Sequence, residues 1–564
     1  MAVHNTEVAD LFDKMADLLE IKDENPFRIR AYRNAALTIR NLSKSLKNMI
    51  EEDIDLTGLP HIGKDLAAKI REIVETGTFA ALKKVGLPLG LSELMRIGSL
   101  GGRGIKKLYE GLHITNLEEL KEAAETGKIR EIVGFAEHTE KKILENIATV
   151  TESKKRTKLI VADRILEDFV EYLKSGEVAG SVRRRKETVG DGDILVADDG
   201  SDVIDRFVVY EDVKKVLAKG PTKSSVLLKS GFQVDLRVIG KESYGAALLY
   251  FTGSKEHNIE LRKMAVKKGL KINEYGLFDG KKRIAGKSEQ EMYRALGLPY
   301  IEPELREDRG EIDAAQKGKL PSLIDVKDIR GDLHMHSTYS DGKCDLEGMV
   351  QAAVKKGYEY IGVTEHSQRI RIAGGLKPKE VEKVIRHIDR LNKKFKNIII
   401  LKGIEVDILE DGKLDLPDDI LAQLDYRVCS VHYKFNLSLQ AQTERIIRAM
   451  DSPYFNILGH PTGRIIGGRK PYDIDMERIM QAAKERGCVL EVNSQPDRLD
   501  LNDLHCRMAK EIGVKVAVST DAHSIDDLDR MKYGVGQARR GWIEKKNVIN
   551  TGTLRQLKKA FKRR

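Results

Sequence analysis

From about residue 325 to 564, the chain alternates short apolar segments with helix-like segments, and many apolar segments end at a histidine or a carboxylate. The predicted strands span residues 360–364, 398–405, 426–431, 457–459, 489–493 and 516–519. Repeated strand–helix units predict a parallel sheet, here closed into a distorted βα (TIM-like) barrel. Because the strand ends of such a barrel converge on one mouth, we expect a site built from side chains far apart in the sequence.

The side chains at these strand ends are of the types that bind divalent metal ions. His334 and His336 form a His-x-His pair, whose imidazoles project to the same side of a strand and can share an ion. The further candidates are Asp341, His366, Glu405, His432, His460, Asp521 and His523. A single histidine is usually structural, but six of the chain's 13 histidines fall in this pattern, which scattered residues would not give.

On these residues, the segment 325–564 resembles the polymerase and histidinol phosphatase (PHP) domain. The resemblance implies a phosphoesterase with up to three ions, and the mixed nitrogen and oxygen ligands suit Mn²⁺ or Zn²⁺. Glu365 stands where an aspartate often precedes the histidine, so its role stays open. Arg464 and Arg469 are candidates for holding a phosphate, with a solvated loop as the alternative.

A second group of carboxylates lies in the segment 180–196, which reads GSVRRRKETVGDGDILV. On a strand, Asp191 and Asp193 point to the same side because side chains alternate with a period of two. Two adjacent carboxylates repel each other unless a cation lies between them, which suits Mg²⁺. Asp235, on a neighbouring predicted strand over 232–239, would complete the set. The Gly-Ser turn and the basic residues after it are suited to a triphosphate, so the segment predicts two-metal nucleotidyl transfer.

With the stretches YFTGS at 250–254 and NEYGL at 273–277, residues 1–320 resemble a family X DNA polymerase. The resemblance makes Asp191, Asp193 and Asp235 the catalytic ligands of Mg²⁺ or Mn²⁺. Tyr250 and Phe251 would select the sugar. Lys255 stands where relatives carry an acidic residue, so the contacts there stay open. The residues implied at the nucleotide are Gly180, Ser181, Arg184, Gly190, Tyr250, Phe251, Gly253, Asn258 and Arg262, of which Asn258 and Arg262 would face the minor groove of the nascent base pair.

Residues 1–150 have helical periodicity with three similar Gly-containing breaks, at 59–64, 97–102 and 132–137. Each resembles a helix-hairpin-helix motif, whose tight turn exposes backbone N–H groups to a phosphate. Each also departs from the motif at one glycine, since His61 and Ser99 replace the first and Ala136 the second. The alternative is that these glycines only end helices. The implied DNA-binding residues are Pro60, His61, Ile62, Gly63 and Gly101.

Lys69 lies on the helix expected after the first break. A lysine amine with a lowered pKa can form a Schiff base with the aldehyde of an abasic sugar. Lys69 is therefore a candidate lyase nucleophile. An ordinary lysine that contacts phosphate or solvent is the alternative.

At 564 residues, the chain is expected to contain several folding units. The predicted domains are a helical domain with the first hairpin (1–85), a helical DNA-binding domain with the further hairpins (86–155), an α/β nucleotidyltransferase palm (156–240), a thumb-like nucleotide-selecting subdomain (241–320) and a PHP metallo-phosphoesterase domain (325–564). Residues 206–210 are predicted to form a strand. The polar stretch 306–321 reads as a linker.

The formal charge of +10 suits a polyanionic partner, although charge alone is weak evidence for nucleic acid. Four cysteines without a Cys-x-x-Cys pair argue against a disulfide framework or a thiolate zinc site. With no visible signal peptide and no apolar run long enough to span a bilayer, we expect a soluble, cytoplasmic protein with no membrane partner. We also expect a monomer.

Over nearly its whole length, the chain resembles the bacterial and archaeal family X DNA polymerases with a C-terminal PHP domain. The resemblance implies filling of short gaps in base excision repair, with gapped or primer-template DNA and dNTPs as partners. It also implies a 3′-5′ exonuclease, with AP endonuclease and 3′-phosphatase activity as further options. Two alternatives remain: a nucleotidyltransferase for RNA or a small molecule beside a small-molecule phosphatase, and a DNA-binding scaffold whose barrel has lost catalysis.

Overall fold

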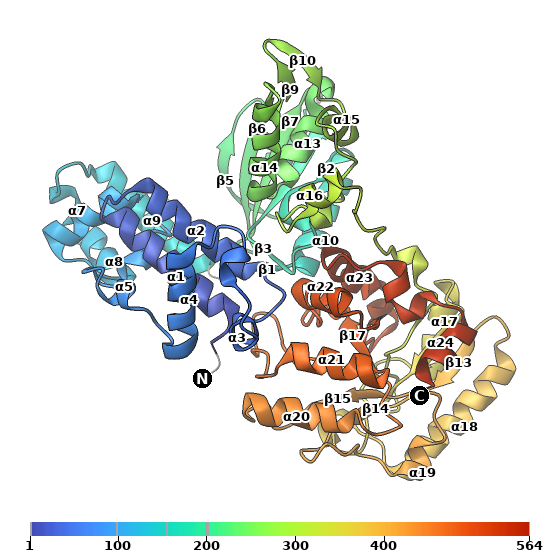
Figure 1. Ribbon diagram of the computed structural model, residues 1–564. Helices are drawn as coiled ribbons and strands as arrows, with labels where there is room; N and C mark the ends of the chain where they lie inside the picture. Colours follow the sequence, from blue (N-terminus) through green and yellow to red (C-terminus); the bar gives the residue numbers. More distant parts are fainter. Residues whose placement is uncertain (1–2, 98–99, 154–155, 198–201, 563–564) are drawn as a thin grey trace. The chain divides into compact units, whose positions relative to one another are not determined.

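The computed structural model describes residues 3–97, 100–153, 156–197 and 202–562. It divides into two compact units, Met1–Lys155 and Arg156–Arg564 (Figure 1). Gly98 and Ser99, in the second expected hairpin, lie outside the described residues. Among the described residues, no helix is both long enough and apolar enough to cross a membrane.

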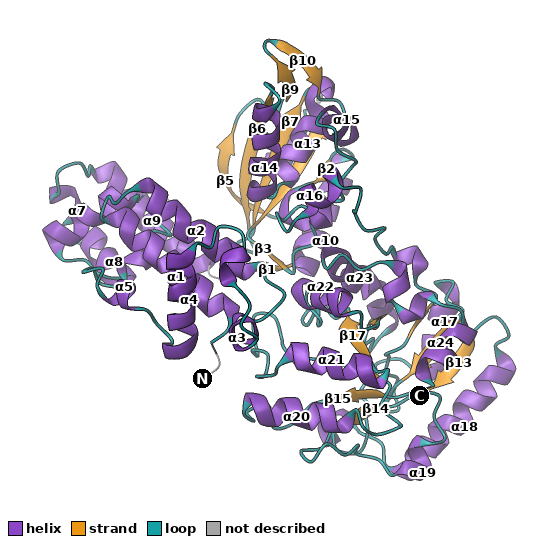
Figure 2. Cartoon of the chain, in the orientation of Figure 1, coloured by secondary structure: helices purple, strands orange, loops and turns teal. Residues whose placement is uncertain are grey.

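The first unit consists of helices and turns, with no strand among its described residues (Figure 2). Its core is lined by the apolar faces of these helices, and Phe12 contacts the rings of Tyr32 and Phe79 at centroid distances of 5.4 and 5.8 Å. The α-helices are α1 (Asn5–Ile21), α2 (Pro26–Arg40), α3 (Leu46–Glu51), α4 (Lys64–Thr76), α5 (Ala80–Lys83), α6 (Leu91–Leu94), α7 (Gly102–Leu112), α8 (Leu117–Glu125) and α9 (Glu137–Ser153).

Each expected Gly-containing break precedes a helix of this unit, namely α4, α7 and α9. A backbone hydrogen bond of the same type closes the breaks at 59–64, 97–102 and 132–137. The N–H of one residue donates to the carbonyl three positions earlier: Ile62 to Leu59 at 3.3 Å, Leu100 to Ile97 at 2.8 Å and Phe135 to Ile132 at 3.0 Å. His61 has a φ of +62° and Gly134 a φ of +100°. The histidine thus adopts the left-handed conformation usual for the motif's first glycine, so the turn geometry is retained.

Residues 156–320, here called the sheet module, contain a five-stranded sheet of order β2-β4-β7-β6-β5 and a three-stranded sheet of order β10-β9-β8. Helices α10 and α12 pack on one face of the larger sheet. The strands are β1 (Thr157–Lys158), β2 (Glu177–Val178), β3 (Thr188–Val189), β4 (Asp191–Ala197), β5 (Val213–Lys219), β6 (Lys223–Leu228), β7 (Gln233–Ile239), β8 (Lys271–Asn273), β9 (Gly276–Asp279) and β10 (Lys282–Ala285). The helices are α10 (Leu159–Leu173), α11 (Gly180–Arg183), α12 (Val203–Val208), α13 (Tyr244–Thr252), α14 (Lys255–Lys267), α15 (Glu289–Ala295) and α16 (Glu311–Gln316).

The strand predicted at 206–210 is wrong, because Arg206 to Val208 form the end of helix α12. Val203 and Phe207, four positions apart, both point into the core, so the helical period decides this short segment. The neighbouring strand β5 escaped prediction because its sequence is rich in exposed lysine, as edge strands often are.

The interpretation of residues 306–321 as a linker is also wrong for its first half. Arg306 is fully buried and pairs with Glu289 at 2.5 Å, and buried Glu311 contacts His257 at 2.6 Å. Residues 311–316 form helix α16. Charge-rich composition suggested solvent exposure, but Arg306 and Glu311 each have a buried partner.

Residues 325–562, the barrel module, contain two all-parallel sheets, β11-β12-β13 and β14-β15-β16-β17-β18. A parallel bridge from Met335, after β11, to Ala522, after β18, and another from His366, after β12, to Glu405 of β14 join the two sheets into a distorted barrel. The strands are β11 (Gly331–Asp332), β12 (Tyr360–Val363), β13 (Ile399–Lys402), β14 (Glu405–Asp407), β15 (Val428–Ser430), β16 (Ile457–Leu458), β17 (Val489–Asn493) and β18 (Val516–Ser519). The helices are α17 (Leu346–Lys355), α18 (Pro378–Lys394), α19 (Asp418–Leu421), α20 (Leu439–Ala449), α21 (Met476–Arg486), α22 (Asp503–Ile512), α23 (Met531–Arg540) and α24 (Leu554–Phe561).

The sheet and barrel modules share hydrophobic cores. Leu499 and Tyr533 of the barrel module lie in the core between α10 and the five-stranded sheet. Trp542 lies in the core around α13, α14 and α15. Because each of these cores draws residues from both modules, the two modules pack against each other within the second compact unit.

Candidate active sites

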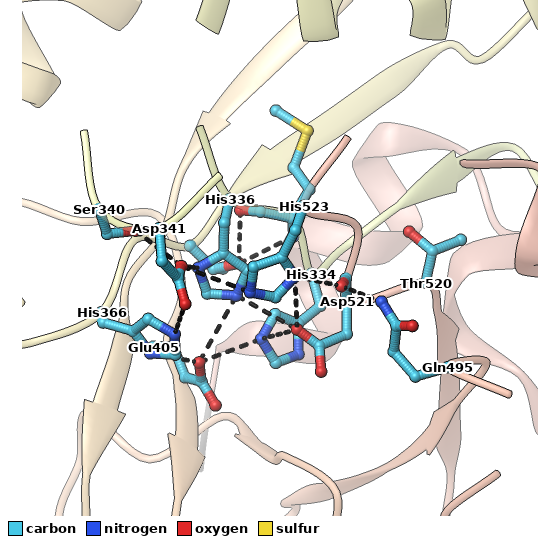
Figure 3. A network of polar contacts seen from close by, with 12 residues as sticks. His334, His336, Ser340, Asp341, His366, Glu405, Gln495, Thr520, Asp521 and His523 are labelled. Carbon is cyan, nitrogen blue, oxygen red and sulfur yellow. Dashed lines mark hydrogen bonds and ion pairs between the residues drawn. The ribbon is translucent and has the colours of Figure 1, made fainter. Parts of the chain in front are cut away.

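All nine predicted metal ligands of the barrel module follow or begin strands at one end of the barrel, and the structure brings them together. Figure 3 shows His334, His336, Asp341, His366, Glu405, Asp521 and His523 of this cluster. His336 and His334 approach Asp521 with nitrogen–oxygen distances of 3.2 and 3.5 Å. Asp341, from the loop after His336, approaches His523 at 3.3 Å. Three groups have ligand atoms that all lie within 4.8 Å of one another: His336, Asp341, His366 and His523; His334, His336 and Asp521; and His366, Glu405 and His432.

Glu405, at the start of β14, lies at the centre of this cluster. Its carboxylate is 2.8 Å from Nδ1 of His366, 3.3 Å from Nε2 of His432 and 2.9 Å from Nε2 of His460. His460, which belongs to none of the three compact groups, is therefore tied to the cluster through Glu405. The side chain of Glu405 is 1% exposed, so water cannot solvate its charge.

The donor atoms of the cluster fit divalent ions. Several buried polar atoms make no hydrogen bond of ordinary geometry, although some lie within ion-pair distance of another residue of the cluster: Nε2 of His334, both ring nitrogens of His336, Nδ1 of His366, Oε2 of Glu405, Nδ1 of His432 and Nδ1 of His460. Leaving buried polar atoms without hydrogen bonds is costly, and such atoms are rare in folded proteins. Metal coordination would satisfy them, and mixed imidazole and carboxylate donors suit Mn²⁺ or Zn²⁺.

Charge and burial set the protonation of the cluster. Burial alone would raise the pKa of Glu405, but the charges of His366, His334 and His432 outweigh it and hold this pKa well below its usual range. Burial lowers the pKa of His336 to about 3, and the neighbouring His366 and His523 act in the same direction. The His336 imidazole is therefore neutral at physiological pH, which is the form that binds a metal ion.

Two residues that sequence reasoning did not single out support these ligands. Glu491 accepts a hydrogen bond from Nδ1 of His334 at 2.7 Å, which leaves Nε2 of that ring facing the cluster. Asn493 donates to Asp521 at 3.1 Å. Both lie on β17, whose sequence VLEVN carries a carboxylate within an apolar strand, and that was the available signal.

Glu365 is buried and accepts hydrogen bonds from the backbone N–H of Ser337 at 3.1 Å and from the hydroxyl of Ser340. Its contacts thus order the loop that carries Asp341. Arg464 does not face the cluster, because it donates to the carbonyls of Arg498 and Leu499 and to Glu187 of the sheet module.

In the sheet module, the predicted carboxylates lie on adjacent parallel strands. Asp193 on β4 pairs in register with Asp235 on β7, and Asp191 lies two residues earlier on the same side of β4. Burial raises the pKa of Asp193 to about 7, with the charges of Asp191 and Asp235 in the same direction. The trio thus concentrates negative charge, as a divalent cation site requires.

Gly180 begins the short helix α11 directly beside this trio. With a φ of +63°, it adopts a conformation that disfavours other residues, and a Cβ there would lie 2.3 Å from Oδ2 of Asp193. This close approach explains why the turn requires glycine. Ser181 follows on the same helix, and Gly190 immediately precedes β4.

The basic residues after this turn are held by acidic partners. Arg183 pairs with Glu289 at 2.8 Å. Arg184 donates to Glu307 at 3.0 Å and to the carbonyl of Thr252, at the end of α13. Thus Arg184 lies next to the YFTGS stretch, where Gly253 has a φ of +70°.

One surface hollow is lined by three of the four predicted base-pair and sugar residues, namely Tyr250, Asn258 and Arg262. Asn258 donates to the carbonyl of Tyr250 at 2.7 Å. Phe251 does not line this hollow and packs instead under the guanidinium of Arg237, 4.1 Å from the ring centroid.

In the first unit, Lys69 lies on α4, where its amine pairs with Asp65 and lies 5.6 Å from the ring centroid of Tyr32. Its side chain is 15% exposed. Pro60, His61, Ile62 and Gly63 form the turn before that helix, and Gly101 caps α7.

Three family models match parts of the chain. They describe a helix-hairpin-helix domain over residues 3–79, a DNA polymerase beta thumb over residues 247–307 and a PHP domain over residues 332–495.

The chain is 38% identical to the DNA polymerase/3′-5′ exonuclease PolX of Bacillus subtilis (strain 168), over 574 aligned residues that span 100% of both chains. It is also 33% identical over 247 residues to a probable phosphatase of Thermoanaerobacter sp. (strain X514), which covers 41% of this chain and 96% of the relative. A probable phosphatase of Clostridium acetobutylicum is 28% identical, over 36% of this chain and 83% of the relative. Since one relative matches from end to end and the matched domains fall in the same order, the chain belongs to the PolX family, the family X DNA polymerases with a C-terminal PHP domain.

Proposed function

We propose that this protein is a DNA polymerase that fills short gaps during DNA repair, and that its barrel module is a metal-dependent 3′-5′ exonuclease. The observation that carries the proposal is the presence, in the second compact unit, of a carboxylate trio suited to Mg²⁺ and a nine-residue cluster suited to further ions. The full-length similarity to a polymerase/exonuclease supports it. We also propose that the domain boundaries lie near residues 85, 155, 240 and 320.

In the polymerase site, Asp191, Asp193 and Asp235 would hold Mg²⁺ or Mn²⁺. Two such ions supply activation of a primer 3′-hydroxyl and stabilisation of leaving pyrophosphate. Around them, the turn at Gly180 and Ser181 offers backbone N–H groups to the triphosphate, and Arg184 supplies positive charge.

Nucleotide selection is assigned to residues that line or border the surface hollow. Tyr250 and Phe251, with Gly253 after them, would contact the sugar. Asn258 and Arg262 carry hydrogen-bond donors suited to the minor-groove edge of a base pair.

In the barrel module, the nine-residue cluster would hold up to three Mn²⁺ or Zn²⁺ ions. These ions supply an activated water and a positive environment for the phosphate oxygens. Glu491 orients His334, and the neutral His336 imidazole offers a lone pair without first losing a proton.

DNA would be held in the first unit by the backbone around Pro60, His61, Ile62, Gly63 and Gly101, which contacts phosphates without reading sequence. Lys69, beside the first turn, is proposed as the lyase nucleophile for abasic sites.

The test uses a gapped duplex with a labelled primer, dNTPs and either Mg²⁺ or Mn²⁺. Asp235→Ala should abolish primer extension and leave exonuclease activity within twofold of the parent. His334→Ala should do the reverse. If both variants keep both activities, or if each loses both while remaining folded, the assignment of one activity to each site is wrong.

A second activity of the barrel module is favoured by its similarity to the two probable phosphatases. We propose that the same cluster removes a 3′-phosphate that blocks extension and cleaves at abasic sites. Primers ending in a 3′-phosphate, and duplexes with an abasic site, should be processed by the parent protein but not by His334→Ala.

A further inference from the structure

We propose that Arg540, on helix α23 of the barrel module, is a positioning residue for nucleotide binding in the sheet module: it holds the turn that carries Gly180, Ser181 and Arg184. The inference rests on the proposed polymerase function. It gives the barrel module a role in DNA synthesis that is separate from its own metal cluster.

Two side chains of helix α23 donate hydrogen bonds to backbone carbonyls at the point where α11 ends. Arg540, whose side chain is 1% exposed, donates from Nη1 to the carbonyl of Arg184 at 2.7 Å. Gln537, one turn earlier, donates to the carbonyl of Arg185 at 2.9 Å. Arg184 is the C-cap residue of α11 and Arg185 follows it, and carbonyls at a helix end have no partner inside the helix. These two donors therefore fix the chain where α11 ends. The proposed phosphate-binding residues, Gly180 and Ser181, start the same four-residue helix.

Arg540 also controls the charge that faces Arg184. Nη1 of Arg540 lies 2.8 Å from Oε1 of Glu307, and Nε of Arg184 lies 3.0 Å from the same oxygen. Lys186 approaches the other oxygen of Glu307 at 3.6 Å. Arg540 and Arg184 therefore both neutralise Glu307, and Arg184 is the residue proposed to contact the triphosphate.

The remaining donors of Arg540 anchor it within its own module. Its Nε and Nη2 donate to Oδ2 of Asp503, at the start of α22, over 3.0 and 2.7 Å. A guanidinium suits this position because its planar fork can bond a carbonyl and two carboxylates at once, which a lysine amine cannot do with the same geometry.

The direction of the effect follows from these contacts. Without Arg540, the Arg184 carbonyl loses its donor and the end of α11 is released. Glu307 also loses a cationic partner, so its negative charge acts more strongly on Arg184 and competes with the triphosphate. Both changes weaken nucleotide binding, and neither touches the carboxylate trio.

The neighbouring Arg539 provides a matched control. It lies on the same helix, its side chain is 16% exposed, and it pairs with Glu304 at 2.7 Å in the sheet module. It contacts Glu302, Glu304 and the carbonyl of Ile324, so it bridges the same two modules through residues other than Arg184.

The experiment compares Arg540→Met, Arg540→Lys and Arg539→Met in the full-length protein, by single-nucleotide gap filling over a range of dNTP concentrations. Arg540→Met should raise KM for dNTP about tenfold while kcat changes less than threefold. Arg540→Lys should be intermediate. Arg539→Met should stay within twofold of the parent in both constants. Exonuclease activity should stay within twofold in all three variants.

Equal increases in KM for Arg540→Met and Arg539→Met would overturn the inference, as would a parallel loss of both activities with unchanged KM. If Arg540→Met does not fold, Arg540→Lys and Gln537→Leu carry the same test, with a KM increase of about threefold or more expected for each. Equilibrium binding of the Mg²⁺ complex of a dNTP is measured in parallel. A parent that binds this complex but extends no primer would refute the proposed function alone, and a tenfold weaker affinity of Arg540→Met would still support the inference.

Discussion

Replacing Asp193 with asparagine should remove polymerase activity and at the same time stabilise the metal-free protein. In the absence of metal, Asp193 is half-buried beside two other carboxylates, and its pKa is raised to about 7. A carboxyl group whose pKa rises on folding from 3.8 to about 7 lowers stability at high pH by up to about 4 kcal/mol, at about 1.36 kcal/mol per pKa unit. Because the side chain still reaches solvent, we expect about half of this, ~2 kcal/mol.

The sign of the effect depends on pH. Near pH 4, Asp193 is protonated in the folded state and a little under half protonated in the unfolded state, so the penalty is still small. Between pH 4 and 7, the unfolded state ionises while the folded state keeps its proton, so the penalty grows. Above about pH 7, both states are ionised and the penalty is constant. The stability gain of Asp193→Asn should therefore be small at pH 4 and about 2 kcal/mol at pH 8.

The assay is urea unfolding followed by circular dichroism, in EDTA, at pH 4 and pH 8, with gap filling measured separately. Asp212→Asn is the control, because Asp212 is a surface residue, 58% exposed and 3.8 Å from Lys229, and its loss should change stability by less than about 0.5 kcal/mol. Saturating Mg²⁺ should narrow the gap between parent and variant, since an ion that binds only the folded trio stabilises the parent. A variant that is no more stable than the parent at pH 8 would refute the argument that burial and the neighbouring carboxylates disfavour the ionised form of Asp193.

Three further predictions concern the other sites. Gly180→Ala should reduce gap filling at least about 100-fold, because its Cβ would lie 2.3 Å from Oδ2 of Asp193. Gly231→Ala, also at positive φ but with open space around it, should keep activity within twofold. Glu405→Gln should lose bound Mn²⁺ or Zn²⁺, measured by elemental analysis, and exonuclease activity, while gap filling persists; retention of full metal content would contradict its central place in the cluster. Lys69→Met should abolish borohydride trapping on abasic DNA and Lys64→Met should not, and an undiminished adduct with Lys69→Met would exclude Lys69 as nucleophile.

Much of the architecture could be predicted because it follows from local patterns. The period-two placement of Asp191 and Asp193 gave their common side on β4, and the strand-end positions of the histidines gave their convergence at one barrel mouth. Even the substituted hairpin kept its form, since His61 adopts the left-handed conformation of the glycine it replaces.

The parts that could not be predicted depend on partners distant in sequence. The segment around Arg306 and Glu311 looked like a linker, because nothing nearby in sequence reveals Glu289 or His257 as buried counter-charges. In the sequence, Glu491 is a single carboxylate within an apolar strand, and only the structure reveals its contact with His334. No regular spacing in the sequence identifies the two residues of such a pair.

The shared hydrophobic cores determine how the protein unfolds. Leu499 and Tyr533 cannot leave the sheet module's core without exposing apolar surface on both sides, so heat should unfold the two modules in one cooperative step. Unfolding of the protein would then remove polymerase activity and exonuclease activity together. A cell would not be left with a nuclease that shortens DNA ends after the polymerase able to restore them has gone.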